Sequence, residues 1–331
     1  MPFRSLFFLL LSLLLPLAQG QLADDDFVNA EKSYREGRVA EAESFYVRVG
    51  PGHPDYPQAQ LRLGTIYYST RRPALAEKCF REYLRFQESA EVYSLLAGAE
   101  FNQEKFAQAY ESAKAALRLD RDYAKAYTAL GMIYTARKAW QEADAAYREA
   151  LRLDEKDSST WFLLGRSYYL RNEFAKAKGA FEAALRLSPQ SVRIYENLGL
   201  TLDLLGEPAA ADKAFLQGIE MNRHGPQPEA SIHITYAAFL FKLNRLEESQ
   251  AQLRQAVKLE PQDRGAHYEL ARVLFRMKRL EEAAREGEEA LRAGGPDYRV
   301  HYLLSRIYTA AGNQERAAQH ATHAASLAEQ K

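Results

Sequence analysis

A pattern of large apolar, small and polar residues recurs along the chain with a period of 34 residues. Two successive stretches show it clearly, through the pairs Tyr127/Trp161, Leu130/Leu164, Gly131/Gly165, Tyr134/Tyr168, Ala143/Ala177, Tyr147/Phe181 and Ala150/Ala184. A fixed period of this length is typical of stacked structural repeats. Extended in both directions, the frame predicts nine units that begin near Ala23, Pro57, Ala90, Ala124, Ser158, Val192, Ala230, Arg264 and Tyr298.

Two positions of the frame hold small side chains in every unit, which indicates a pair of closely approaching helices. The eighth position reads Ala30, Gly64, Ala97, Gly131, Gly165, Gly199, Ala237, Ala271 and Ser305. The twentieth reads Ala42, Ala76, Ala109, Ala143, Ala177, Ala211, Ser249, Ala283 and Ala317. The fifteenth position holds residues that tolerate a left-handed helix end in five units, namely Gly37, Asn172, Gly206, Asn244 and Gly312. Pro73 and Pro208 follow two residues later, where proline suits the first turn of a second helix.

This spacing resembles the tetratricopeptide repeat (TPR), with its Trp, Leu-Gly and Tyr followed by Ala, Phe and a late Pro. The resemblance implies that each unit is a helix-turn-helix. The expected fold class is therefore all-α, an α-solenoid in which TPR repeats form a right-handed superhelix over residues 21–331. Each unit is expected to bury its core mainly against the next.

Several units depart from the pattern. The first has Asn29 and Ser33 where Leu and Tyr are usual, the third has Glu100 at the Tyr position, and the eighth has Gly287 at the Phe position. Because Glu100 and Gly287 are internal, we expect looser packing around them. No separate polar capping helix follows the last unit, so we expect its second-helix face to be exposed or covered by another copy. That face carries Ala317, Ala321 and Ala324.

Composition and charge exclude several classes of partner. The 331 residues include 44 Lys and Arg and 44 Asp and Glu, so the formal net charge is zero. This balance removes a global electrostatic case for nucleic acid or anionic membrane as the main partner. The single cysteine, Cys79, excludes an intrachain disulfide and a cysteine-based zinc site. We expect Cys79 to be a small buried residue.

The first twenty residues resemble an export signal. Arg4 precedes an apolar run from Leu6 to Leu15, Pro16 ends the run, and Ala18 and Gly20 are the small residues that a signal peptidase reads. We therefore expect a signal peptide at residues 1–20, no transmembrane anchor after its cleavage, and a periplasmic or secreted protein. The alternative is an uncleaved anchor, although the apolar stretch is shorter than the ~20 residues that span a bilayer.

The sequence contains none of the catalytic signatures that mark phosphate-binding loops, dinucleotide folds, zinc proteases or serine hydrolases. We therefore predict no enzymatic activity and no cofactor. His233, His267 and His301 occupy the same position of three successive units, where TPRs usually place Trp or Tyr. Equivalent positions of stacked helices lie ~8–10 Å apart, too far for zinc–nitrogen bonds of about 2 Å. We interpret them as packing residues and predict no metal site, since His320 and His323 lack a third ligand.

The TPR resemblance places a partner-binding groove at positions two, five, nine, twelve and thirteen of each first helix. The candidate site residues are Tyr34, Tyr68, Phe162, Arg166, Tyr169, Phe241, Lys242, Tyr268, Arg272, Phe275, Arg276, Arg299, Tyr302 and Arg306. Aromatic and Arg side chains are the anchors enriched in binding hot spots, and the basic ones cluster in units seven to nine. The alternatives are that the aromatics only pack between helices and that the charges are only solvated.

The chaperone-tail clamp of some TPR proteins has Lys at position five and Asn at position nine. Here these positions hold residues such as Thr128 and Met132, so that specificity is not supported. The sequence predicts a non-catalytic scaffold of the bacterial cell envelope that binds an extended peptide or partner helix, preferably an acidic or carboxylate-bearing segment, in assembly or secretion of envelope complexes. Two alternatives stay open: a structural protein that self-associates through its C-terminal helix, and a regulatory or glycan-binding subunit of an envelope polysaccharide enzyme.

Overall fold

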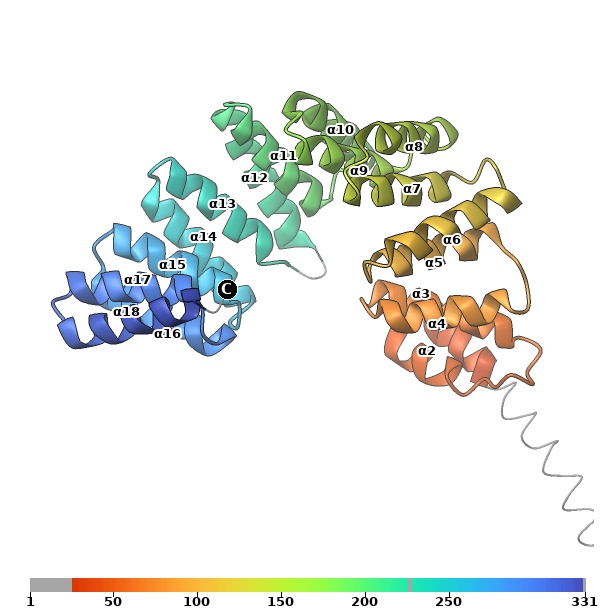
Figure 1. Cartoon of the computed structure of the whole chain (residues 1–331), viewed down its shortest axis with the longest axis horizontal. Coiled ribbons are helices and arrows are strands. Elements are labelled where there is room, and N and C mark those ends of the chain that lie inside the picture. Colours follow the sequence, from red (N-terminus) through yellow and green to blue (C-terminus); the bar gives the residue numbers. More distant parts are fainter. Residues whose placement is uncertain (1–25, 226–227, 330–331) are drawn as a thin grey trace, which may run out of the picture. The chain divides into compact units, whose positions relative to one another are not determined.

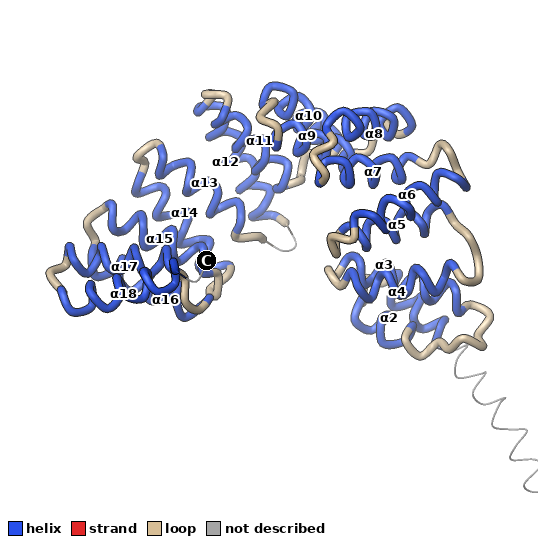
Figure 2. The backbone as a smooth tube through the Cα atoms, viewed as in Figure 1, coloured by secondary structure: helices blue, strands red, loops and turns tan. Residues whose placement is uncertain are grey.

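The computed structural model describes residues 26–225 and 228–329, and the regular elements within these ranges are all helices (Figure 2). The predicted signal peptide, residues 1–20, lies outside the described residues. The chain divides into two compact units, one up to Thr160 and the other from Trp161 onward. Each unit is built from consecutive antiparallel helices (Figure 1).

The first unit begins with a helix at residues 26–35. The helices that follow it are α2 (Val39–Tyr46), α3 (Tyr56–Ser69), α4 (Pro73–Leu84), α5 (Ala90–Phe101), α6 (Phe106–Leu119), α7 (Ala124–Ala136) and α8 (Trp140–Leu153). From α2 to α8 each helix packs against the next, and α5 also contacts both α3 and α7.

The second unit continues the same arrangement from α9 (Ser158–Leu170), which begins in the last residues of the first unit. Its other helices are α10 (Phe174–Leu187), α11 (Val192–Leu204), α12 (Pro208–His224), α13 (Ser231–Lys242), α14 (Leu246–Leu259), α15 (Arg264–Arg276), α16 (Leu280–Gly294), α17 (Tyr298–Ala310) and α18 (Gln314–Glu329). The first helices of successive pairs, α11, α13, α15 and α17, contact one another in order. The predicted all-α class and α-solenoid architecture are confirmed.

The turn inside each helix pair has one backbone conformation throughout the described chain. The five predicted Gly and Asn residues at position fifteen all have positive φ angles, between 60° and 79°. The same position has φ between 57° and 61° in the other four pairs, where it is Arg71, Glu104, Lys138 and Lys278. The left-handed turn is therefore imposed by the packing of the two helices even where a long side chain makes it unfavourable.

Small residues at position eight let an aromatic ring of the second helix reach the first. A Cβ atom on Gly131 would lie 2.6 Å from the ring of Tyr147, and one on Gly165 would lie 2.7 Å from the ring of Phe181. Both rings are almost completely buried. The predicted close approach of the paired helices is thus confirmed, and glycine is required where the ring fills the space that a Cβ would take.

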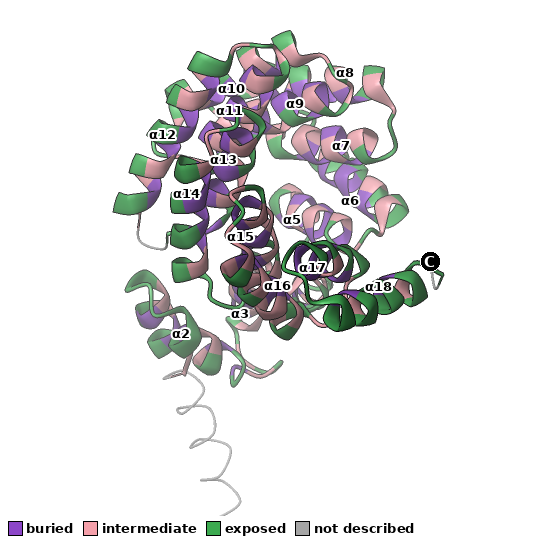
Figure 3. Cartoon of the chain, turned by 90° about the vertical axis from the view of Figure 1, so that its left-hand side faces the viewer, coloured by how far each residue is buried: buried purple, intermediate pink, exposed green. Residues whose placement is uncertain are grey.

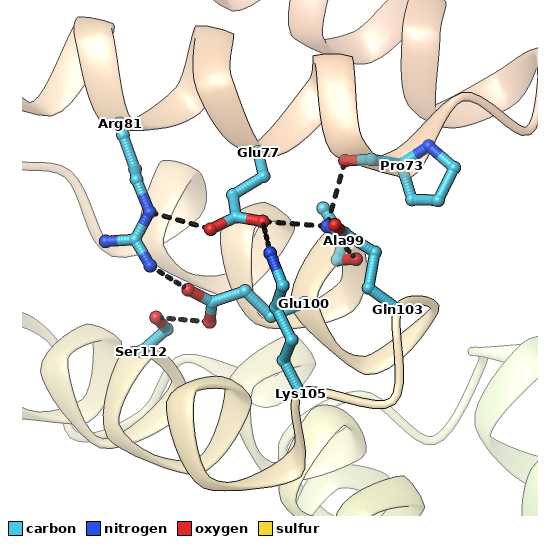
Figure 4. A network of polar contacts seen from close by, with 8 residues as sticks. All are labelled: Pro73, Glu77, Arg81, Ala99, Glu100, Gln103, Lys105 and Ser112. Atoms are coloured by element: carbon cyan, nitrogen blue, oxygen red, sulfur yellow. Dashed lines mark hydrogen bonds and ion pairs between the residues drawn. The ribbon is translucent and has the colours of Figure 1, made fainter.

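Glu100 does not loosen the packing of its repeat, so that prediction was wrong. Its carboxylate is fully buried and accepts hydrogen bonds from Arg81 Nη2 at 2.5 Å and Ser112 Oγ at 2.7 Å (Figure 4). Arg81 also donates through Nε to Glu77 at 3.0 Å, and Glu77 accepts from Lys105 Nζ at 2.7 Å. A buried carboxylate needs such partners, and α4 and α6, the helices on either side of α5, supply them in place of an aromatic ring.

The expected looseness at Gly287 was also wrong, for a different reason. The space left by the missing aromatic ring is occupied by Leu304 of the following helix, α17. A Cβ atom on Gly287 would lie 2.6 Å from Leu304 Cδ2. Leu304 and Gly287 are both buried, so the next repeat fills the gap.

The last helix, α18, is mostly exposed (Figure 3). Ala317 and Ala324 are nevertheless buried, and only Ala321 of the three predicted alanines is exposed. The expectation that all three form a bare face was therefore wrong, because two of them face the interior. The predicted burial of Cys79 is confirmed, and burial raises the pKa of its thiol to about 11.

Candidate functional site

Three successive first helices of the second unit, α13, α15 and α17, form a pocket of about 570 Å³ near their C-terminal ends. The turn into α16 closes one side. The lining residues are Phe241, Arg272, Phe275, Arg276, Lys278, Leu280, Leu303, Arg306 and Ala310. We call this cavity the basic pocket, because four of these nine residues are cationic and none is acidic.

The apolar part of the basic pocket comes from side chains that also belong to the core. Leu303 is buried between α15 and α17, and Phe241 and Phe275 are partly buried against the same hydrophobic cluster. Rings held in this way lose little conformational entropy when a ligand covers them. The floor of the pocket is therefore a rigid apolar surface.

The cations of the basic pocket are only partly neutralised. Arg272 Nη1 contacts Glu269 Oε2 at 2.5 Å. Arg276, Lys278 and Arg306 have no carboxylate within ion-pair distance among residues 26–225 and 228–329. Like charges gathered beside an apolar surface raise the local concentration of anions and favour a ligand with carboxylate groups.

Aromatic rings hold two of the guanidinium groups in place. Arg272 lies 5.0 Å from the centroid of the Phe241 ring, and Arg306 lies 5.4 Å from that of Phe275. Arg306 also lies 6.0 Å from the ring of Tyr302. These cation–π contacts orient planar groups that can each donate two parallel hydrogen bonds to a carboxylate.

Two carboxylates that do not line the pocket pair with arginines of α15 and α17. Burial raises the pKa of Glu269, the partner of Arg272, while the charge of Arg272 acts in the opposite direction. Asp297 caps α17 and pairs with Arg299 at 3.1 Å, and the hydrogen bond from Arg299 lowers its pKa. Arg299 is thereby neutralised, although it lies 5.7 Å from the ring of Tyr268.

The structure brings together five of the fourteen predicted site residues: Phe241, Arg272, Phe275, Arg276 and Arg306. Tyr268, Arg299 and Tyr302 adjoin them through the cation–π contacts. Lys242 ends α13 and is paired with Asp203 at 2.8 Å, outside the lining.

The other predicted site residues lie elsewhere. Phe162 is buried 5.8 Å from the ring of Phe181, and Tyr169 packs 5.6 Å from that of Phe174. Arg166 is exposed on α9. In the first unit, Tyr34 contacts Tyr46 and Arg62. A fifth residue, Tyr68, is half-buried beside Gly98.

Lys278, Leu280, Leu303 and Ala310 line the pocket but were not predicted from the sequence. Lys278 is the most informative of them, because it occupies the left-handed turn position that five other repeats fill with Gly or Asn, with a φ of 61°. The sequence itself shows this lysine close to Arg276, and it could have been recognised there as a further cation of the pocket. The TPR groove positions end at thirteen, so the resemblance could not supply it.

His233, His267 and His301, in the seventh to ninth repeats, are buried, which confirms their interpretation as packing residues. Each also makes a polar contact with the residue nineteen positions later: His233 with Gln252, His267 with Glu286, and His301 with His320. Within the described ranges, no group of three or more His, Cys, Asp or Glu side chains is arranged to hold a metal ion.

The fold and the pocket define a helical-repeat scaffold with a basic, aromatic-floored site on its first helices. Sequence profiles of the tetratricopeptide repeat match residues 17–91, 95–158 and 240–298, and two further profiles of the same repeat match residues 158–191 and 192–224. The chain belongs to the tetratricopeptide repeat family, which typically provides non-catalytic scaffolds that bind protein partners. No curated protein matches the sequence.

Solved structures share the fold at low sequence identity. Yeast Tom70 is 17% identical, with 88% of this chain and 64% of that chain covered and a TM-score of 0.65. A chain of the APC/C heterotetramer Cut9–Hcn1 is 16% identical, with a TM-score of 0.59. The match covers 84% of this chain but only 54% of that chain. A tetratricopeptide repeat protein from Parabacteroides merdae is 14% identical, with 77% and 99% covered and a TM-score of 0.58. Within the described part of the chain, no helix is both long and apolar enough to cross a membrane.

Proposed function

We propose that the protein is an exported, non-catalytic scaffold of the bacterial cell envelope whose basic pocket binds an acidic segment of a partner protein. The observation that carries this proposal is the lining of the pocket, with four cations, an aromatic floor and no carboxylate. A partner segment that pairs acidic and large apolar side chains would satisfy both parts of that lining. The TPR fold supports a protein partner, and the choice of an acidic segment rests on the pocket alone.

The favourable energy of ligand binding comes mainly from the cations that have no ion-pair partner. Arg276, Lys278 and Arg306 are not neutralised by a described carboxylate, so a ligand carboxylate would replace water rather than displace an existing ion pair. Charge-assisted hydrogen bonds to such groups are stronger than neutral ones. Phe241 and Phe275 would add apolar contact beside them, which is the usual combination of anchors at the centre of an interface.

A direct binding measurement tests the proposal. The probe is a fluorescein-labelled, eight-residue peptide of alternating glutamate and leucine, and its anisotropy is followed as the mature protein is added. The double variant Arg276→Glu, Arg306→Glu is expected to bind at least about tenfold more weakly, a loss of about 1.4 kcal/mol. A lysine–leucine peptide of the same length is expected not to bind.

The matched control makes the same change of charge away from the pocket. Lys213 and Arg285 lie exposed on the second helices α12 and α16 of the same unit. The variant Lys213→Glu, Arg285→Glu is expected to bind the acidic peptide within about twofold of wild type, apart from the long-range effect of net charge. Equal losses in both double variants would show that the basic pocket is not the site.

A further inference from the structure

In three successive repeats of the second unit, a histidine meets a side chain at the same partner position, but the partner is a different residue type each time. In each, the buried histidine of the first helix meets the residue nineteen positions later on the second helix. His233 Nδ1 lies 2.8 Å from Gln252 Oε1, His267 Nδ1 lies 2.7 Å from Glu286 Oε2, and His301 Nδ1 lies 2.9 Å from His320 Nδ1. The three contacts therefore differ in how they respond to protons.

The His267 contact favours the charged imidazole. Its Nδ1 faces a carboxylate, and its Nε2 lies 3.1 Å from the carbonyl oxygen of Pro261. Both acceptors require an N–H, so both ring nitrogens are protonated when both bonds are made. The hydrogen bond to Glu286 accordingly raises the pKa of His267.

The His301–His320 contact favours the neutral imidazoles. His320 Nε2 lies 3.3 Å from Glu288 Oε1, which needs a proton on Nε2. In the neutral ring, Nδ1 of His320 is then the acceptor, and His301 Nδ1 donates to it. The bond needs one unprotonated Nδ1, so once both rings carry two protons two N–H groups would face each other across 2.9 Å. Burial and the neighbouring histidine charges lower the pKa of His301, and burial also lowers that of His320.

The other charged groups around this pair do not reverse the preference for neutral imidazoles. The His323 ring stacks on His301 at 5.1 Å and adds a further basic group. Arg316 of α18 and Asp297 at the start of α17 act on the pair with opposite signs. Glu288 of α16 favours protonation of His320, but it also accepts a hydrogen bond from Tyr308 Oη at 3.0 Å.

The pair lies where a small loss of packing matters. Helix α18 packs against α17, and its buried apolar residues are only Ala317 and Ala324. Helix α17 carries His301 together with Leu303, Arg306 and Ala310, which form one wall of the basic pocket. Repulsion between the two rings, once both are protonated, therefore acts on the helix that holds part of the ligand site.

We propose that the His301–His320 pair makes the α17–α18 repeat acid-labile, so that acidification below about pH 6.5 weakens the basic pocket and releases its ligand. This inference rests on the proposed function, because it concerns the regulation of the same pocket. The charges of the ligand site do not explain such an effect, since glutamate side chains of the probe stay ionised at pH 5.5. Protonation of Glu269 would free Arg272 and strengthen binding, which is the opposite direction.

The neighbouring repeats supply the test variants. His320→Gln reproduces the His233–Gln252 contact, and His320→Glu reproduces the His267–Glu286 contact. The affinity for the glutamate–leucine peptide is measured at pH 7.5 and pH 5.5. We expect wild type to bind about three- to tenfold more weakly at pH 5.5, because binding is linked to protonation of the pair. The Gln variant is expected to change less than about twofold, and the Glu variant to bind more tightly at pH 5.5.

Hydrogen exchange separates this inference from the proposed function. Protection factors of α18 amides, corrected for intrinsic rates at each pH, are expected to fall at pH 5.5 in wild type but not in the Gln variant. If no peptide binds at pH 7.5, the proposed function fails, and α18 protection still decides whether the repeat is acid-labile. An unchanged wild-type protection, or the same loss of affinity in the Gln variant, would overturn the inference.

Discussion

Two glycines of one helix pair have opposite surroundings. Gly165 of α9 faces the buried ring of Phe181, so an added Cβ would lie 2.7 Å from the ring carbons. Gly179 lies in the middle of α10, and an added Cβ would meet no atom within 4 Å. The same chemical change therefore tests close packing at one site and helix propensity at the other.

We expect Gly165→Ala to lower the free energy of unfolding by about 1–3 kcal/mol, because the methyl group overpacks against a ring that cannot move aside. Gly179→Ala is expected to raise it by about 1 kcal/mol, since alanine is the better helix former. Urea denaturation of both variants measures the two values. A Gly165→Ala variant as stable as wild type would mean that Phe181 has room to shift.

Single residues also show what the repeat pattern can and cannot predict. Position eight was predicted correctly because one Cβ atom decides which residues fit, whereas position fifteen was predicted in five repeats and keeps the same turn in the other four with long side chains. The packing around Gly287 was predicted wrongly. Leu304 of the next repeat, 17 positions further along the chain, fills the space of the missing aromatic ring. A pattern read within one repeat does not contain that neighbour.

Among the elements, α4, α5 and α6 are joined by the buried Glu100 network rather than by an aromatic ring. Burial raises the pKa of Glu100 above the value of about 4.3 for an unfolded chain. A carboxyl group of this kind contributes stability that is fully present below its unfolded pKa. That contribution is lost as the pH rises through the folded pKa.

We therefore expect Glu100→Gln to remove a pH-dependent part of the stability. The unfolding free energy of wild type relative to the variant should fall as the pH rises above the unfolded value of about 4.3, by about 1.4 kcal/mol for each unit of pKa difference. Glu77→Gln is the matched control with the opposite sign, because hydrogen bonds from Lys105 and Arg81 lower the pKa of Glu77 against its desolvation. Parallel curves for wild type and Glu100→Gln would contradict this account.

The candidate site was only partly predictable because its residues come from different helices and turns. First-helix positions supplied Arg272, Arg276 and Arg306, since a repeat frame places equivalent residues on one face. Lys278 and Leu280 come from the turn and the second helix, which the frame assigns to packing. Phe162 occupies a groove position in the frame but is buried, because its ring packs against Phe181.

At the scale of the whole molecule, a net charge of zero coexists with a basic pocket whose cations are only partly neutralised. The average conceals the pocket because acidic residues elsewhere in the chain balance its four cations. Attraction of an acidic ligand should therefore be local and should weaken as salt shortens the Debye length. Long-range attraction to anionic surfaces is not expected from this charge distribution.

Export involves the whole chain, including the predicted signal peptide. We expect the full-length protein, expressed in a bacterium, to be recovered from the periplasmic fraction with Gln21 as its first residue. Intact mass and N-terminal sequencing of the recovered protein check the cleavage site. Replacing Leu9 and Leu10 by arginine should retain the protein in the cytoplasm, because the apolar run is what the export machinery reads. Cytoplasmic wild-type protein that still begins with Met1 would contradict the proposal.

Cys79 gives the first unit a built-in reporter. It is the single thiol of the chain, it is buried on α4, and its pKa is raised to about 11, so the folded protein offers almost no thiolate to a maleimide or disulfide reagent. Labelling at neutral pH therefore has to wait for α4 to detach from its neighbours. The rate of that reaction measures how often this repeat opens in otherwise native protein, without any engineered probe.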